Sequence, residues 1–181
     1  CGRCGCRRGG GDVGAAYVRE VGCRVRSRER IPGWGVSGER AIEWLARAPQ
    51  PFFLFVLSID PHSPCAPPGA FDRYSSDAPA EIDGGLASLD RTGLTPEQRD
   101  RIRSLYLGEV AFNDHSLGRL LGELQSRGLW DRTIVAFTSD HGEEFWEHGG
   151  RGDGKALYEE SLRVPLVVRD PNTRGGARIT R

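Results

Sequence analysis

The sequence contains no methionine among its 181 residues. A chain without methionine does not begin at a start codon, so we expect it to be a piece of a longer protein. Such a piece gives no information about a signal peptide or about the compartment of the parent protein. The length is nevertheless sufficient for one domain with its own hydrophobic core.

An excess of charge of one sign and long apolar stretches are also missing. The 25 basic residues are balanced by 25 acidic residues, so no overall field favours nucleic acid or an anionic membrane. The apolar run at residues 52–59 is far shorter than the roughly 20 residues of a membrane-spanning helix. The sequence therefore predicts neither a nucleic-acid partner nor a membrane segment.

Cysteine is scarce beyond the first part of the chain. Four cysteines lie at positions 1, 4, 6 and 23, and Cys65 stands alone. No second pair at zinc-finger spacing follows, and the first histidine is His62, so a zinc knuckle is disfavoured. The odd number of cysteines also argues against a complete disulfide framework.

Two regions of the chain differ in composition. Residues 1–38 are rich in glycine and arginine with little apolar periodicity, which predicts a disordered or non-homologous segment. A translated wrong reading frame is an open alternative for this segment. Residues 39–181 carry regular apolar patterns, and we expect the folded domain to begin there.

The second region alternates helical and strand patterns. Apolar spacing predicts helices near 41–48, from Thr95 to about Gly128, and near 156–161. The four residues from Thr95 form a capping-box sequence with proline at the first helical position. Apolar runs predict strands at 52–59, 133–138 and 164–168, the first of them buried on both faces. Together these patterns predict an α/β fold with a mostly parallel sheet flanked by helices.

Candidate functional residues follow two of these strands. Asp140, His141 and Gly142 come after the strand at 133–138, and His62 lies in a Pro-His-Ser-Pro loop after the strand at 52–59. In open α/β sheets, ligands bind beyond the carboxyl ends of the strands, and an adjacent carboxylate and imidazole are typical metal ligands. The alternative is two ordinary surface loops. If the strands run parallel as near neighbours, the two loops converge.

The motif order closely resembles the C-terminal part of the sulfatase catalytic domain, within the alkaline phosphatase superfamily. The resemblance runs from about Ile42 to Arg169. It rests on the segments 51–64, 130–143, 147–149 and 157–166, in the family order. It implies that the chain forms part of an alkaline-phosphatase-like sandwich.

The resemblance also implies roles for individual residues. Asp140 and His141 match the family's ligands for a divalent metal ion, most often calcium; zinc or manganese stay open, because histidine is an unusual calcium ligand. His62 matches a catalytic, substrate-binding histidine that donates a hydrogen bond to sulfate or to the leaving oxygen. Lys155 lies near, but offset from, the position of a substrate-binding lysine, and the alternative is an exposed side chain. Asp153 stands where related sequences carry histidine.

Other polar residues of the matched region have weaker assignments. Glu143, Glu144 and His148 surround the Asp-His pair, but the His-Glu-x-x-His spacing of metalloproteases is absent. Asp114 and His115 lie within the long predicted helix. They either support the site from behind or belong to an ordinary polar helix face.

The nucleophile segment of the family is not found in this sequence. Sulfatases carry Cys-x-Pro-x-Arg or Ser-x-Pro-x-Arg, whose first residue becomes formylglycine. Cys65 is followed by Pro67, but Gly69 occupies the place of the arginine. We expect the nucleophile, together with an Asp-Asp pair for the metal, upstream of Ile42 in a full family member. The chain alone is therefore expected to be inactive.

Three functional hypotheses follow. The first is hydrolysis of a sulfate ester of a small molecule or carbohydrate by the full-length protein. The second is a phosphodiesterase or phosphonate monoester hydrolase of the same superfamily, because an Asp-His metal pair serves phosphoryl transfer equally well. The third is a truncated, non-catalytic pseudoenzyme.

Overall fold

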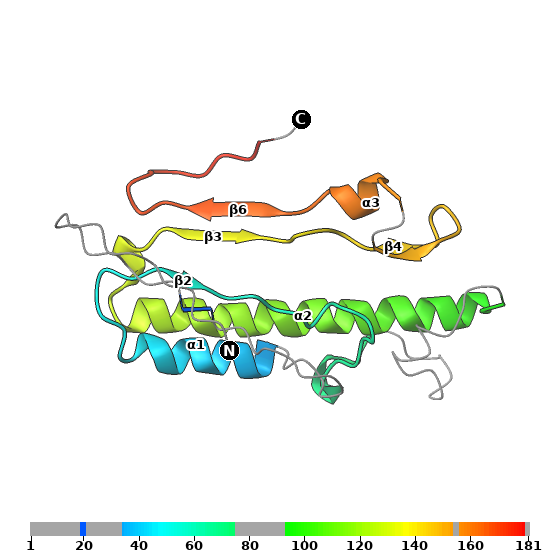
Figure 1. Ribbon diagram of the computed structural model, residues 1–181, viewed down its shortest axis with the longest axis horizontal. Helices are drawn as coiled ribbons and strands as arrows, with labels where there is room; N and C mark the ends of the chain where they lie inside the picture. The colour runs from blue at the N-terminus through cyan, green and yellow to red at the C-terminus, as the bar shows by residue number, and fades with distance from the viewer. Residues whose placement is uncertain (1–18, 21–33, 75–92, 154–155, 180–181) are drawn as a thin grey trace, which may run out of the picture.

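The computed structural model describes residues 19–20, 34–74, 93–153 and 156–179. Helices and short strands alternate along the chain (Figure 1). Most of the segment 1–38 lies outside the described residues, and the first helix already begins before the predicted boundary at residue 39. The elements in order are β1 (Arg19–Glu20), α1 (Trp34–Leu45), β2 (Leu54–Phe55), η1 (Gly69–Phe71), α2 (Pro96–Ser126), η3 (Trp130–Arg132), β3 (Val135–Thr138), β4 (Glu144–Phe145), β5 (Arg151–Gly152), α3 (Glu159–Leu162) and β6 (Leu166–Arg169).

The long helix α2 begins and ends where its sequence predicts. The Thr95 hydroxyl accepts a hydrogen bond from the Gln98 amide at 3.3 Å, and the Gln98 side chain accepts one from the Thr95 amide at 2.9 Å. At the other end Gly128 has φ +65° and the Leu129 amide donates to the Leu124 carbonyl at 2.9 Å. This pairing closes the helix with a glycine in the left-handed conformation, so α2 is fixed by local sequence at both ends.

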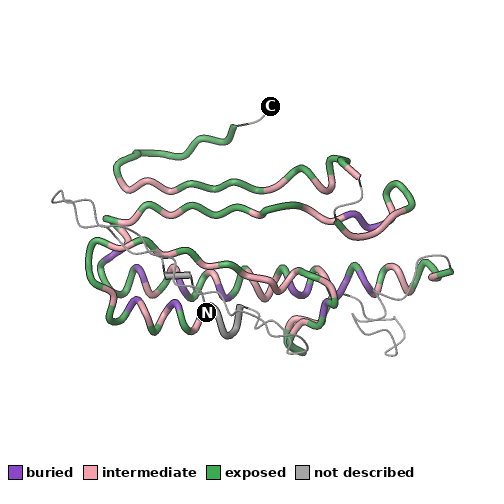
Figure 2. Tube along the Cα trace, in the orientation of Figure 1, coloured by how far each residue is buried: buried purple, intermediate pink, exposed green. Residues whose placement is uncertain are grey.

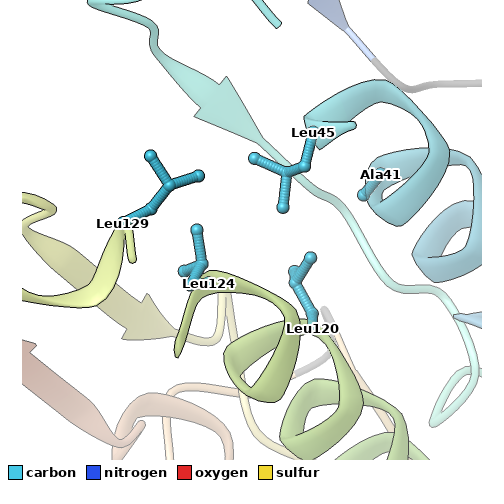
Figure 3. Packing of buried hydrophobic residues seen from close by; sticks show 5 residues of the cluster. All are labelled: Ala41, Leu45, Leu120, Leu124 and Leu129. Atoms are coloured by element: carbon cyan, nitrogen blue, oxygen red, sulfur yellow. The ribbon is translucent and has the colours of Figure 1, made fainter. Parts of the chain in front are cut away.

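The larger hydrophobic cluster lies where α1 meets the C-terminal half of α2. Ala41 and Leu45 of α1 point toward Leu120 and Leu124 of α2, with Leu129 beside them (Figure 3). All five are at most 7 % exposed. Partly buried side chains from the strand segments pack against this cluster, including Phe52, Leu54, Val56 and Val135.

The described strands form three two-stranded ladders. β1 and β2 are parallel, β3 and β6 are antiparallel, and β4 and β5 form an antiparallel pair. The expected parallel arrangement is therefore wrong for β6. A parallel neighbour needs a crossover long enough to return the chain to the start of the strand, and the four-residue helix α3 reverses the chain instead.

The expectation of a strand buried on both faces at 52–59 is also wrong. Alternate side chains face the core cluster, while Phe53, Phe55 and Leu57 are 47–51 % exposed. In β6, Leu166 to Val168 are at least 60 % exposed, and Figure 2 shows this exposure along β3 and β6. Within the described residues the helices cover only one side of the strands, which leaves the other side bare.

The two strands that precede the candidate loops run in the same direction. β2 and β3 both lead from left to right in Figure 1, and Leu54 and Val135 pack against the same core cluster. No hydrogen-bonded ladder joins them in the described part of the chain. The parallel, near-neighbouring arrangement is nevertheless present, so the loops after β2 and β3 leave at the same end.

Candidate functional site

The loop after β3 carries Asp140 and His141 side by side and open to solvent. Asp140 Oδ1 accepts a hydrogen bond from the His141 amide at 3.1 Å. The imidazole Nε2 of His141 lies 3.9 Å from Asp140 Oδ2 and 3.6 Å from Asp153 Oδ2. Asp153, which follows β5, is thus brought to the same imidazole edge.

The other ring nitrogen of His141 fixes its tautomer. Nδ1 lies 2.7 Å from the Gly142 carbonyl oxygen, and a carbonyl only accepts, so Nδ1 carries the hydrogen. This hydrogen bond, together with the charges of Asp140, Asp153 and Glu143, raises the pKa of His141, while burial opposes the rise. In the neutral ring the Nε2 lone pair is left free, as metal-ligating histidines require.

Gly142 is required by packing rather than by a turn. Its amide donates to the Ser161 carbonyl at 2.8 Å, and an added Cβ would lie 2.0 Å from the Glu160 carbonyl oxygen. The loop after β3 is thus pressed onto α3, and no side chain fits between them. The close approach at this glycine is thus made by another part of the same chain.

The β4–β5 hairpin follows the loop and is organised by a buried carboxylate. Glu144 is 4 % exposed, and its Oε1 accepts hydrogen bonds from the Gly150 amide at 2.9 Å and the His148 amide at 3.2 Å. The His148 ring stacks on Tyr158 at 3.7 Å, and its Nδ1 lies 2.6 Å from Glu160 Oε1. Glu144 and His148 therefore have structural partners that tie the hairpin to itself and to α3.

His62 lies exposed in the loop after β2. Its Nδ1 is 2.6 Å from the Ser63 carbonyl oxygen, so Nδ1 again carries the hydrogen. The free Nε2 accepts a hydrogen bond in the neutral ring and donates one only when the ring is protonated. A contact from His62 to an anionic group therefore uses the protonated ring.

Glu143 links the two loops electrostatically. Burial raises the pKa of its carboxyl group, and the charges of Arg151, His141 and His62 act in the opposite direction. The strands β2 and β3 run in the same direction (Figure 1), so the loops that carry His62 and the Asp140–His141 pair leave at the same end.

Cys65 lies in a cluster with Glu109 and Arg151, and the sequence did not predict this cluster. Glu109 of α2 is 6 % exposed and accepts a hydrogen bond from the Ala66 amide at 2.7 Å. Cys65 is 2 % exposed, and burial with the nearby Glu109 raises its pKa to about 11. Arg151 of β5 lies within reach of both Cys65 and Glu143, and its burial lowers its pKa. The sequence does hold one indication that Glu109 is buried. Glu109 lies one helical turn after the apolar Leu105, and therefore on the same face of α2.

The other candidate residues from the sequence are Lys155, Asp114 and His115. Lys155 lies outside the described residues. Asp114 and His115 are exposed on α2, where the His115 ring lies 5.5 Å from the Phe71 ring of η1.

The donor set at the edge fits part of a divalent-metal site. Asp140 offers carboxylate oxygens and His141 a free imidazole nitrogen, both of which are usual ligands for such ions. Among the described residues, no group of three or more His, Cys, Asp or Glu side chains is arranged to hold a metal ion. Asp140 and His141 are therefore two adjacent candidate ligands, and the described residues do not form an enclosed metal site around them.

Comparison with known proteins decides the family. A family model described as Sulfatase matches residues 36–179. The chain belongs to the sulfatase family. The match includes every described element from α2 to β6, and both candidate loops lie inside it.

Individual relatives agree with this membership. The chain is 32 % identical over 154 residues to an arylsulfatase of Clostridium perfringens, covering 76 % of this chain and 31 % of that protein. It is 31 % identical over 125 residues to an endo-4-O-sulfatase of Bacteroides thetaiotaomicron, covering 67 % of this chain and 24 % of that protein. This sulfatase-family chain thus spans about a third or less of the relatives it matches.

A solved structure gives the fold of the sulfatase-family chain. The phosphonate monoester hydrolase of Agrobacterium radiobacter is 30 % identical, with a TM-score of 0.62 over 74 % of this chain and 32 % of that one. The chain therefore forms part of an alkaline-phosphatase-like α/β fold, as its sequence predicts. No helix in the described part of the chain is long and apolar enough to cross a membrane.

Proposed function

We propose that this chain is part of the catalytic domain of a sulfatase, which hydrolyses a sulfate ester to an alcohol and sulfate. The observation that carries the proposal is the convergence of two loops at one edge. The loop after β3 presents Asp140 and His141, and the loop after β2 presents His62 within electrostatic reach of Glu143. Membership of the sulfatase family supports this reading of the edge.

Each residue has a defined task in the proposed reaction. Asp140 and His141 would hold a divalent cation, most often calcium in this family, and the bound ion would supply positive charge to stabilise the transferring group. Protonated His62 donates from Nε2 to a sulfate oxygen or to the departing alcohol oxygen. Lys155 is kept as a proposed substrate contact.

We also propose a source for the nucleophile of the reaction. Within the printed sequence no Cys-x-Pro-x-Arg or Ser-x-Pro-x-Arg segment is found. Formylglycine, the family's nucleophile, would therefore come from residues outside this sequence. The alcohol portion that we propose is a small molecule or a carbohydrate, since one relative of this chain is named an endo-4-O-sulfatase.

A second candidate is hydrolysis of a phosphonate monoester or a phosphodiester. The specific observation for it is the structural similarity to the phosphonate monoester hydrolase of Agrobacterium radiobacter. A metal held by carboxylate and imidazole stabilises a transferring phosphoryl group by the same physical effect.

The experiment is an activity assay of the full-length protein that contains this sequence. We expect a higher kcat/KM on 4-nitrophenyl sulfate than on bis(4-nitrophenyl) phosphate or a phosphonate monoester. Asp140→Ala should lower kcat/KM on the sulfate at least about 100-fold, while Asp131→Ala, at a 94 % exposed carboxylate on η3, should change it little. A clear preference for either phosphorus ester would favour the second candidate.

A further inference from the structure

The short helix α3 contacts both the loop after β3 and the turn of the β4–β5 hairpin (Figure 1). It has four residues, and none of them is buried. Leu157, just before α3, is 84 % exposed, and Leu162 at its end is 54 % exposed. A helix of one turn is not stable by itself, and no buried hydrophobic residue of its own anchors α3. Its position is therefore determined by its contacts with these two segments.

The main chain of α3 holds the loop after β3. The last carbonyl groups of a helix have no partner inside the helix, and in α3 the Ser161 carbonyl accepts a hydrogen bond from the Gly142 amide at 2.8 Å. The Glu160 carbonyl oxygen is the atom that an added Cβ at Gly142 would meet first. The Gly142 carbonyl oxygen in turn lies 2.7 Å from Nδ1 of His141. The position of α3 therefore sets that of Gly142, and Gly142 orients the His141 ring.

Side chains join α3 to the hairpin turn. His148 lies in the turn between β4 and β5, and its ring stacks on the ring of Tyr158, with centroids 3.7 Å apart and planes 14° from parallel. The Nδ1 atom of His148 lies 2.6 Å from Oε1 of Glu160. That carboxylate oxygen is buried, and burying a charged oxygen is costly unless an opposite charge or a donor meets it. The contact with His148 therefore offsets the cost of placing Glu160 there.

The turn that carries His148 is itself fixed by the buried carboxylate of Glu144. The Glu144 Oε1 atom accepts hydrogen bonds from the amides of His148 and Gly150. An added Cβ at Gly150 would lie 2.9 Å from Glu144 Oε2, so the turn closes tightly around this side chain. Because Glu144 follows Gly142 closely along the chain, these contacts form a ring that returns to Gly142 through α3.

We propose that His148 is a positioning residue for the candidate metal ligands Asp140 and His141. Its contacts with α3 hold that helix against Gly142, and Gly142 keeps the His141 ring in the orientation that leaves Nε2 free beside Asp140. The inference rests on the proposed function, in which Asp140 and His141 would hold a divalent cation. It gives His148 a part in metal binding without making it a ligand.

The test measures metal binding, without turnover, by the full-length protein that contains this sequence. Calcium is titrated by calorimetry after a chelator has removed bound metal, and hydrogen exchange is followed by mass spectrometry in a peptide that contains Gly142. His148→Ala should weaken calcium binding at least about fivefold, less than the loss of a direct partner of a ligand, and should speed this exchange. The matched control is His115→Ala on α2, where the ring is exposed and lies against Phe71; it should change neither.

Two conservative variants separate the contact with Glu160 from the stack on Tyr158. His148→Asn places an amide nitrogen near the position of Nδ1, so it should keep most of the calcium affinity. His148→Phe keeps only the stacked ring, so it should bind calcium as weakly as His148→Ala. If the two side chains act as a pair, His148→Ala combined with Glu160→Ala should weaken binding no further than His148→Ala alone.

Unchanged calcium affinity in His148→Ala would overturn the proposal, and so would an equal loss of affinity in His115→Ala or in His148→Asn. If His148→Ala does not fold, the comparison of His148→Asn with His148→Phe decides the matter. A protein that binds calcium with this dependence on His148 but hydrolyses no sulfate ester would contradict the proposed function alone. An active sulfatase whose calcium affinity does not depend on His148 would contradict this inference alone.

Discussion

Gly142 shows how one missing side chain shapes the candidate site. An added Cβ would lie 2.0 Å from the Glu160 carbonyl oxygen, so the loop after β3 or α3 must move in a Gly142→Ala variant. We expect this variant to lose about 1–3 kcal/mol of the free energy of unfolding, measured by urea denaturation.

The matched control for this substitution is Gly118→Ala on α2. No atom lies within 4 Å of the Cβ that it adds, and alanine is a better helix former than glycine by about 0.5–1 kcal/mol. The two alanine variants should therefore shift the urea midpoint in opposite directions. A Gly142→Ala chain as stable as the unsubstituted chain would contradict the packing described here.

The residues of the site differ in how visible they are in the sequence. Asp140, His141 and His62 follow apolar runs closely, so the rule that ligands gather at the carboxyl ends of strands makes them candidates from the sequence alone. The contacts of Arg151 and Asp153 depend on how the β4–β5 hairpin folds back. Such contacts are non-local, and spacing along the chain does not encode them.

The loop after β2, which carries His62, packs closely against the helix α2. The Glu109 carboxylate accepts a hydrogen bond from the Ala66 amide, and at Gly108 an added Cβ would lie 2.7 Å from Pro67 Cγ and 2.8 Å from the Phe71 carbonyl oxygen. Glu109→Ala should therefore cost about 1–3 kcal/mol and speed hydrogen exchange of the Ala66 amide. Glu109→Gln, which keeps an acceptor oxygen, should have the smaller effect on both; the reverse order would show that the clamp is not a hydrogen bond.

The segment after this loop is tied to α2 by an ion pair between Asp72 and Arg101. Both guanidinium nitrogens meet the carboxylate, one of them at 2.7 Å, and this hydrogen bonding lowers the pKa of Asp72 below its ordinary value of 3.8. A lowered carboxyl pKa stabilises the fold above pH 3.8, and that stability is lost as the pH falls through the lower folded-state value.

The expected consequence is a pH-dependent effect of Asp72→Asn. The variant should be less stable than the unsubstituted chain by roughly 1 kcal/mol at pH 7, and the gap should close at a pH well below 3.8. Asp131→Asn, which removes a 94 % exposed partner of Arg169, should show no such gap. Urea titrations at both pH values check this, and a gap that persists at low pH would rule out the ion pair as its cause.

Elements fixed by local sequence were predicted better than elements fixed by tertiary context. The capping box at Thr95 and the glycine at 128 determine the ends of α2 within a few residues, so the helix follows from the sequence. The direction of β6 depends on the length of α3, and the exposure of Phe53 and Phe55 depends on what covers the sheet. Neither the direction of β6 nor the exposure of Phe53 and Phe55 is encoded in the residues of the strands themselves.

The described residues form a layer with one covered side and one bare side. The helices α1 and α2 bury one side of the strand segments, while β3 and β6 remain largely exposed (Figures 1 and 2). The chain spans only 31 % of the arylsulfatase that it resembles. It contributes one edge of the proposed catalytic centre, where the proposed metal ligands Asp140 and His141 lie side by side.

We propose Asp140 and His141 as the metal ligands at this edge, and titration of the chain with metal ions measures their binding. Two ligands leave an ion mostly hydrated, so we expect calcium to bind weakly, with a dissociation constant at best on the order of millimolar. Paramagnetic Mn²⁺ should broaden the imidazole NMR signals of His141 before those of His115, calcium should reverse this, and Asp140→Ala should abolish it. Equal broadening of His115 and His141, or an unchanged response in Asp140→Ala, would show that Asp140 and His141 do not bind the ion.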